Sequence, residues 1–195
     1  MDVRARERII ELSSKVDTAF TAIASEITAL QTSAIIQEAL NSTEADWKPS
    51  QELQLYTRFF QSIRNLNNAA AIHISSEDGR RRFSTHEYPS AYDVSNYQNW
   101  DRYFNNVKAA PEQIHVAIGE LLTQHSMVAM TCIDEGFLIL ELDISTLLGQ
   151  VADNHSGKLY LVDSDHFSAM NIFAPSENAS FAEQPYLGIV FNRMD

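Results

Sequence analysis

An apolar repeat with a seven-residue period runs through the first forty residues of the chain. Its successive members stand three to five residues apart: Ile9, Leu12, Val16, Phe20, Ile23, Ile27, Leu30 and Ile35. This spacing places a continuous apolar stripe on one side of a helix. We therefore expect a helix of about 30 to 38 residues, much longer than the average globular helix of ~11, that serves as a stalk or spine.

A second amphipathic segment follows and predicts a partner for that helix. Asn41-Ser42-Thr43 ends the first helix, and a turn with Pro49 precedes residues 50–66. The apolar side chains of this segment gather on one face: Leu53, Tyr56, Phe59, Phe60, Ile63 and Leu66. The two helices are expected to pack as a hairpin.

After Asn68 the pattern changes to that of strands. Short runs that are β-branched or alternating, with turn residues between them, occur at 69–76, 80–85, 113–118, 127–133, 136–142, 158–162, 169–173 and 186–191. Residues 90–106 are polar and aromatic and predict a loop and a short helix over a sheet face. Because hairpin-joined strands need no crossover helix, the order predicts an α+β fold: an antiparallel sheet with helices on one face or end.

The charge of the chain narrows its possible partners. The 195 residues carry 26 acidic and 14 basic side chains, and the net charge is -12. That sign is wrong for nucleic acid or for an anionic lipid surface. No stretch reaches the roughly 18 apolar residues that span a bilayer, so we expect that this chain does not itself cross a membrane.

The sequence lacks the usual motifs of catalysis and metal binding. The six histidines are scattered singly, and no P-loop, dinucleotide-binding or nucleophile-elbow pattern occurs. Cys132 lies in the apolar run MVAMTCID, where a thiol is usually a small buried hydrophobe. Asp163, Asp165 and His166 could hold a divalent cation, but an ordinary turn is the favoured interpretation. The sequence therefore predicts no enzyme, no metal site and no cofactor.

Three consecutive arginines, Arg80-Arg81-Arg82, stand out in this acidic chain. They could contact an acidic neighbour or a ligand phosphate. Edge strands often carry charge only to prevent association between sheets, and this second interpretation is favoured.

Four stretches carry a resemblance to a known family. They are the long helix running into AAAIHISSEDG, the aromatic run NYQNWDRYFNN, the segment CIDEGFLILELDISTLL, and GKLYLVDSD. In this order they resemble the extracytoplasmic PAS-like sensor domains called PDC or Cache domains of bacterial histidine kinases, chemoreceptors and diguanylate cyclases. The resemblance covers most of residues 5–175. It implies a PAS-like five-stranded antiparallel sheet, a spinal N-terminal helix that continues from one transmembrane helix, and a final strand that leads to another.

The resemblance also implies a division of the chain. Residues 1–68 would form the spinal helix and the second helix, 69–156 the sensor sheet, and 157–195 a short membrane-proximal strand segment. Few residues follow Gly157, so the second module is reduced or the chain is cut short. Met1 would then replace an upstream membrane helix, and the chain would be the periplasmic part of an inner-membrane protein.

In amino-acid-binding members of the family, an Arg followed two residues later by an aromatic pair, with a later Asp, holds the ligand's carboxylate and amine. Trp100-Asp101-Arg102-Tyr103-Phe104 resembles this motif, with the Arg one residue closer to the aromatic pair. The resemblance implies that Arg102 binds a carboxylate and Asp134 an ammonium group. The aromatic walls and lids would come from Trp100, Tyr103, Tyr97 and Tyr92.

An alternative for this segment has about equal weight. Arg102 and Asp101 would face solvent, and Trp100, Tyr103 and Phe104 would simply cap the sheet, because aromatic side chains over a sheet face are ordinary core. For Tyr92 and Tyr97 the plain role of loop anchors is favoured.

These observations lead to one functional expectation and its alternatives. We expect a ligand-sensing input domain of a bacterial transmembrane receptor that binds an amino acid or carboxylate and relays a change along its N-terminal helix. A homodimer through that helix is expected, because four heptads exceed what one short partner helix covers. The main alternative is a ligand-free PAS-like module for dimerisation or protein interaction, and the third is a small cytosolic enzyme or cofactor-binding protein.

Overall fold

The structure of the protein is a computed structural model. It describes residues 3–43, 45–67, 69–86, 101–118, 126–134, 136–143, 146, 160–163, 168–171 and 188–190. Three helices come first: α1 (Val3–Gln31), α2 (Ala34–Asn41) and α3 (Pro49–Leu66). The later elements are β1 (Ala69–Ser76), β2 (Arg82–Ser84), α4 (Asp101–Ala109), β3 (His115–Ile118), β4 (Ser126–Ile133), β5 (Gly136–Asp143), β6 (Tyr160–Asp163), β7 (Ser168–Asn171) and β8 (Gly188–Val190).

The main sheet has five strands in the order β2-β1-β5-β4-β3, and every neighbouring pair is antiparallel. The central strands β1 and β5 pair over almost their whole length, with His73 opposite Ile139. Strands β4 and β5 form a hairpin across Asp134, whose φ of 41° is a turn conformation. The predicted α+β class with a five-stranded antiparallel sheet is confirmed.

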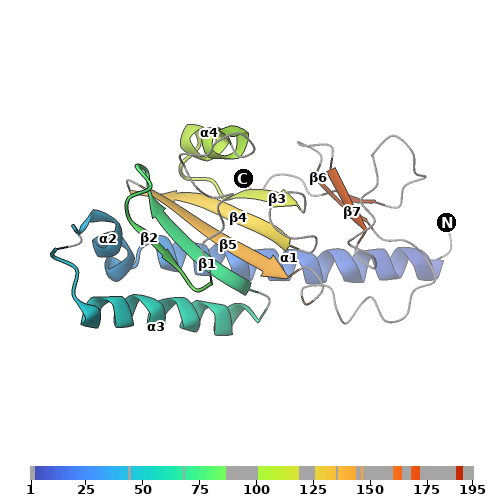
Figure 1. The fold of residues 1–195 in the computed structure, drawn as a ribbon. Helices are drawn as coiled ribbons and strands as arrows, with labels where there is room; N and C mark the ends of the chain where they lie inside the picture. Colours follow the sequence, from blue (N-terminus) through green and yellow to red (C-terminus); the bar gives the residue numbers. More distant parts are fainter. Residues whose placement is uncertain are drawn as a thin grey trace.

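The first three helices cover one face of this sheet, here called the inner face (Figure 1). Side chains alternate between the two faces of a strand, so the inner face carries every second residue. Its buried apolar members are Ile72, Ile74, Phe83, Met127, Ala129, Ile133, Leu138, Leu140 and Leu142. They pack against buried side chains of the helices: Phe20, Ile23, Ile27, Leu30, Ile36, Ala39, Leu40, Leu55, Phe59 and Leu66. Burial of this apolar layer is the main stabilising contribution to the fold.

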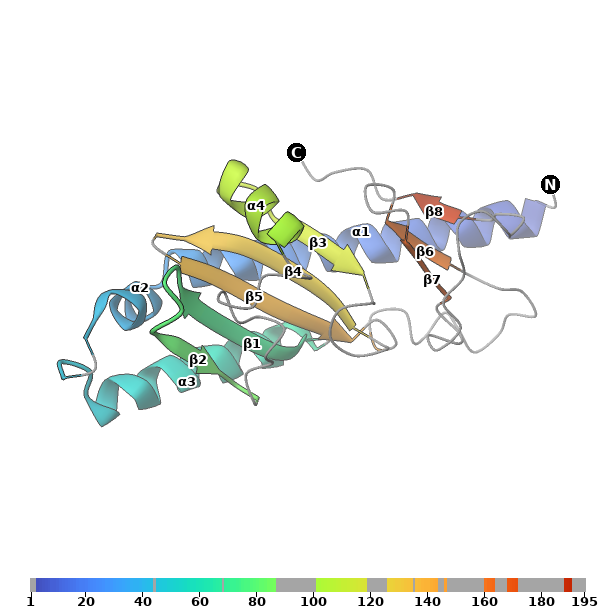
Figure 2. The same ribbon diagram turned by 45° about the horizontal axis from the view of Figure 1, so that its top comes forward.

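The opposite face of the sheet, the outer face, is covered differently. Helix α4 lies over β3 and β4 on this side, as the turned view shows (Figure 2). The sheet is therefore a layer between the α1–α3 group and α4.

The long N-terminal helix is interrupted, contrary to the expectation of one helix of about 30 to 38 residues. Helix α1 has 29 residues and ends at Gln31, and α2 begins at Ala34. Ser33 between them has an extended backbone, and its N–H bonds to the carbonyl of Leu30. The hydroxyl of Thr32 bonds the carbonyl of Thr28. Such side-chain bonds compete with continued helix at Ser and Thr, and the bend lets α2 place Ile36 and Leu40 in the core.

Helices α1 and α3 are joined by a polar cluster as well as by apolar contacts. Glu26 of α1 accepts hydrogen bonds from Arg58 Nη1 at 2.9 Å, Ser62 Oγ at 2.6 Å and Asn65 Nδ2 at 3.2 Å, all on α3. Burial alone raises the pKa of Glu26, but these hydrogen bonds and the charge of Arg58 outweigh it and hold the pKa below its usual range. Glu26 is therefore ionised in this joint at neutral pH.

The start of β5 approaches β1 so closely that only glycine fits. Gly136 pairs with Ser76, and a Cβ at this position would run into the backbone carbonyl oxygen of Ser75 and lie 3.1 Å from Leu40 Cδ1. The hairpin and the edge of the helical layer meet here.

A separate three-stranded sheet follows, with the order β7-β6-β8. Strand β6 is antiparallel to β7 and parallel to β8, and β6 and β7 contact β3. These strands occupy the places that the sequence pattern predicted, while the division of the chain at residues 68 and 156 stays a prediction.

Among the described residues, no single helix has the length and apolar character to span a membrane. The bent pair 13–31 and 34–41 reaches that threshold by length and composition.

Candidate functional site

The outer face of the sheet is the candidate site, because a sensor of the expected kind would bind its ligand between this face and residues 90–106. The strands present a mixed set of side chains here. The apolar members include Ala71, Val128, Met130, Phe137 and Ile139, and the polar members include His73, Ser75, Ser84 and Glu141. The apolar members lie on β1, β4 and β5, and the polar members on β1, β2 and β5.

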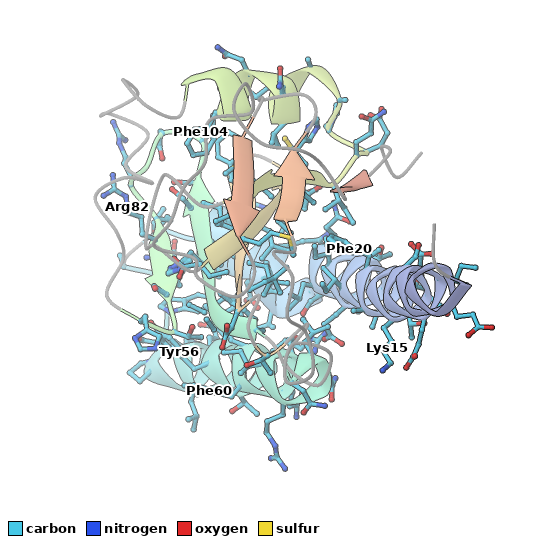
Figure 3. All side chains as sticks on the ribbon, turned by 90° about the vertical axis from the view of Figure 1, so that its right-hand side faces the viewer. Lys15, Phe20, Tyr56, Phe60, Arg82 and Phe104 are labelled. Atoms are coloured by element: carbon cyan, nitrogen blue, oxygen red, sulfur yellow. The ribbon has the colours of Figure 1, made fainter. Side chains whose placement is uncertain are left out.

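Helix α4 is attached to this face through an aromatic contact. Phe104 is almost fully buried and meets Phe137 of β5 edge to face, with ring centroids 4.7 Å apart. Figure 3 shows Phe104 between α4 and the sheet. Val107 is fully buried beside it, and the ammonium group of Lys108 lies 5.7 Å from the Phe137 ring centroid and pairs with Glu77 at 2.5 Å. The contact area beneath α4 is thus packed by side chains of the protein.

A buried histidine lies at the centre of the polar part. His73 has no exposed side-chain surface; its Nδ1 is 2.6 Å from Ser84 Oγ and its Nε2 is 3.0 Å from Glu141 Oε1. A carboxylate and a hydroxyl on two flanking strands therefore fix the imidazole ring from both sides. Glu141 is the member of this group that a polar molecule on the outer face can reach, because its side chain is 14% exposed whereas that of His73 is fully buried.

The sequence-predicted site residues fall into three groups in the structure. Arg102 and Tyr103 lie in the first turn of α4, and the direction of their side chains is outside what is described. Trp100, Tyr97 and Tyr92 lie outside the described residues. Asp134 is exposed in the turn between β4 and β5, where a positive φ favours Asp and Asn over most residue types. Their joint role in binding stays a prediction.

The residues that sequence reasoning missed are Glu141 and Ser84. Glu141 sits at an alternate position of the mostly apolar strand β5, and Ser84 ends the short strand β2; both are on the same side as His73. The alternation within FLILELD was the available signal, because Glu141 is the polar member of the set Phe137, Ile139 and Glu141. The hydrogen bonds of Glu141 and Ser84 to His73 depend on the strand order β2-β1-β5, which could not be predicted from the sequence.

One short segment of β4 connects α4 on the outer face with α1 on the inner face. The thiol of Cys132 lies 3.4 Å from the carbonyl of Val107 in α4. The carbonyl of the same residue accepts a hydrogen bond from Gln31 Nε2 of α1 at 3.0 Å, and Gln31 also bonds Thr131 Oγ1 at 2.9 Å. Burial raises the pKa of the Cys132 thiol, so the thiol is protonated at neutral pH and acts as a donor.

Comparisons with known proteins agree with this arrangement. No family model matches the sequence, and no curated protein matches it. Among solved structures, the sensory domain of the Campylobacter jejuni chemoreceptor Tlp3 with isoleucine bound aligns at TM-score 0.58 and 12% identity, over 89% of this chain and 73% of that one. The ligand-binding domain of the same receptor with L-valine aligns at TM-score 0.55 and 12% identity, over 80% and 65%.

The extracellular domain of the putative histidine kinase vpHK1S-Z8 aligns as well, at TM-score 0.56 and 16% identity, over 77% of this chain and 60% of that one. The chain thus spans between 60% and 73% of the length of these three structures. The protein has the PDC or Cache-like fold of extracytoplasmic sensor domains, with the spinal helix, the five-stranded sheet and the outer-face helix in place.

Proposed function

We propose that the chain is the ligand-sensing input domain of a bacterial signal-transduction receptor and that it lies outside the cytoplasm. The observation that carries the proposal is the sensor-domain fold together with an outer sheet face that is polar at its centre. The Tlp3 domains of the same fold hold L-valine and isoleucine. We propose an amino acid or a related carboxylate as the ligand, and the domain itself performs no catalysis.

The ligand would lie on the outer face beside α4. Arg102 binds its carboxylate through paired hydrogen bonds, and Trp100, Tyr103, Tyr97 and Tyr92 exclude water around it. Two carboxylates can receive the ammonium group: Asp134 in the β4–β5 turn and Glu141 on β5. The location of Glu141 beside His73 supports it as a second candidate, because its side chain is only 14% exposed and so acts in a less polar environment.

The signal would pass through the sheet to α1. A ligand that binds better to one arrangement of α4 shifts the population toward that arrangement. Cys132 supports this route, because its thiol contacts α4 and its carbonyl is held by Gln31 of α1. A displacement of α4 therefore reaches the spinal helix through a single strand residue.

Dimerisation through α1 is part of the proposal. The apolar stripe of α1 divides in the middle: Phe20, Ile23, Ile27 and Leu30 are buried within this chain, and the spacing continues toward the N-terminus at positions 16, 12 and 9. Ile10 in the same half is 60% exposed. The N-terminal half of the stripe is therefore proposed to pair with a second copy.

Calorimetric titration with a panel of amino acids and carboxylates tests the ligand. We expect one class to bind and Arg102→Ala to weaken its affinity about tenfold to a hundredfold, as expected when a charged contact is lost. Lys108→Gln is the matched control, because Lys108 is a cation on the same helix that pairs with Glu77 instead.

Two results would change the assignment. Unchanged affinity in Arg102→Ala removes Arg102 from the site, and a comparison of Glu141→Gln with Asp134→Asn then identifies the ammonium acceptor. Failure of the whole panel favours the ligand-free interaction module, which the tight packing of Phe104 on Phe137 already matches.

A further inference from the structure

A second recess lies away from the outer face, where the end of α2 meets the hairpin between β1 and β2. It is an open hollow of about 790 Å³. Its lining comes from the end of α2, the connection to α3, and the hairpin: Leu40, Ser42, Thr43, Ser76, Glu77, Asp78, Arg80 and Arg81. In Figure 1 these elements meet at the end of the sheet opposite the N-terminus. We call this recess the Arg81 hollow.

The two acidic residues of the hollow already have partners. Asp78 accepts hydrogen bonds from Ser76 Oγ at 2.6 Å and from the backbone N–H of Arg80 at 3.0 Å, and its carboxylate lies 3.3 Å from Arg80 Nε. Glu77 pairs with Lys108 of α4. Both carboxylates and the Arg80 guanidinium are thus compensated.

Unlike Arg80, Arg81 is held by aromatic rings and a backbone carbonyl. Its Nε donates to the carbonyl of Ala39 at 3.2 Å, and its guanidinium carbon lies 4.9 Å from the Phe83 ring centroid and 5.4 Å from that of Trp47. In the part of the chain that the structure describes, Arg81 forms no ion pair. Among the described residues, the cation is therefore fixed in position by two aromatic rings and one carbonyl and not by an ion pair.

Two buried N–H donors at and beside Arg81 lack a hydrogen-bond acceptor. They are Arg81 Nη2 and the indole Nε1 of Trp47, and both are N–H groups. A buried donor without a partner is unfavourable, and more so when it belongs to a charged group. Arg81 lines the hollow and Trp47 does not, so an anion with oxygen acceptors in the hollow would neutralise the guanidinium and offer Arg81 an acceptor.

We propose that the Arg81 hollow is a binding site for a small oxyanion, a carboxylate or phosphate group held by the Arg81 guanidinium. The hollow is lined by other residues than the proposed ligand site, at the end of α2 and the hairpin between β1 and β2, and it touches α4 only through the pair of Glu77 with Lys108. It also gives a function to the arginine run 80–82 beyond protection of a sheet edge.

Fluorescence of Trp47 tests the proposal directly. The chain has two tryptophans, so Trp100→Phe leaves Trp47 as the single reporter. This variant is titrated with sodium phosphate and, separately, with sodium acetate and succinate, each against sodium chloride at equal ionic strength and pH. We expect a saturable change that chloride does not produce. A response to phosphate alone identifies a phosphate group as the ligand chemistry, and a response to the carboxylates alone identifies a carboxylate.

Variants locate the binding. Arg81→Gln should weaken the response about tenfold to a hundredfold, as expected for loss of a charged donor. Arg80→Gln is the matched control and should leave the response unchanged, because Arg80 is exposed and paired with Asp78. Arg102→Ala should also leave it unchanged, which separates this site from the outer face.

A second variant protects the test if Arg81→Gln does not fold. Arg81→Lys keeps the positive charge and removes the paired donors of the guanidinium, and calorimetry in the otherwise native chain should give an affinity reduced up to about tenfold. The proposal is overturned if neither anion gives a saturable response, or if Arg81→Gln folds and responds like its parent. In that case Arg81 serves only to hold the end of α2 through the Ala39 carbonyl.

Discussion

At Gly136 the two central strands approach each other so closely that a single added carbon atom would clash. We predict that Gly136→Ala lowers the free energy of unfolding by about 1–3 kcal/mol, because the added methyl group meets a backbone carbonyl that cannot move without breaking the β1–β5 pairing. Urea unfolding followed by circular dichroism measures the change. Asn105→Ala, at an exposed position of α4, should stay within about 0.5 kcal/mol of the parent. Equal unfolding midpoints for Gly136→Ala and the parent would contradict this account.

At the same scale, residue chemistry could be predicted from the sequence only in part. The motif around Arg102 correctly placed a helix after residue 100, and the pattern at 69–76 and 136–142 correctly placed two central strands. The contact between His73 and Glu141 could not be predicted, because 68 residues separate them and only the strand order brings them together. Arg81 was interpreted as edge charge, since nothing in its neighbours along the chain points to Trp47 or Phe83.

Between elements, the joint of α1 with α3 depends on the ionised form of Glu26. We predict that Glu26→Gln is less stable than the parent at neutral pH by about 1–3 kcal/mol, because hydrogen bonds to a carboxylate are the stronger kind. The pKa of Glu26 is depressed in the folded state, so this stabilisation is complete above the ordinary value of 4.5 and is lost as the pH falls through the lower folded pKa.

The measurement is thermal or urea unfolding of both proteins between neutral and acidic pH. The difference between them should shrink below a pH of about 4.5. Glu52→Gln, in the exposed first turn of α3, serves as the control and should show a small difference. A Glu26→Gln difference that is constant across the pH range would rule out the carboxylate as its source.

The packing of helices on the sheet also explains why the prediction of one long N-terminal helix was wrong. Apolar spacing continues from Leu30 through Ile35 and Ile36, so periodicity alone favours one long helix. The interruption at Thr32 and Ser33 arises because α2 must bend to bring Ile36, Ala39 and Leu40 onto the inner face. Tertiary packing and the local hydrogen bonds of Thr32 and Ser33 together outweighed the apolar periodicity there.

For the whole molecule, the proposal of a dimer through α1 can be separated from the stability of the domain. We predict that Val16→Glu shifts a dimer to monomer in sedimentation velocity, because position 16 continues the buried spacing of Phe20 and Ile23. The thermal midpoint at low concentration should change little. Thr18→Glu, on an exposed side of the same helix, should leave the dimer intact. A parent chain that is monomeric at every concentration would contradict dimerisation.

Helix α1 extends well past the sheet that holds it. In Figure 3, Lys15 projects away from the domain, whereas Phe20 is the first buried side chain among the residues of the helix whose side chains are described. The 17 residues from 3 to 19 span about 25 Å as a rigid rod. A tilt of about 5° at the sheet would then move the tip of the rod by about 2 Å, so in the proposed receptor a small rearrangement beside Gln31 would be enlarged at the far end of α1.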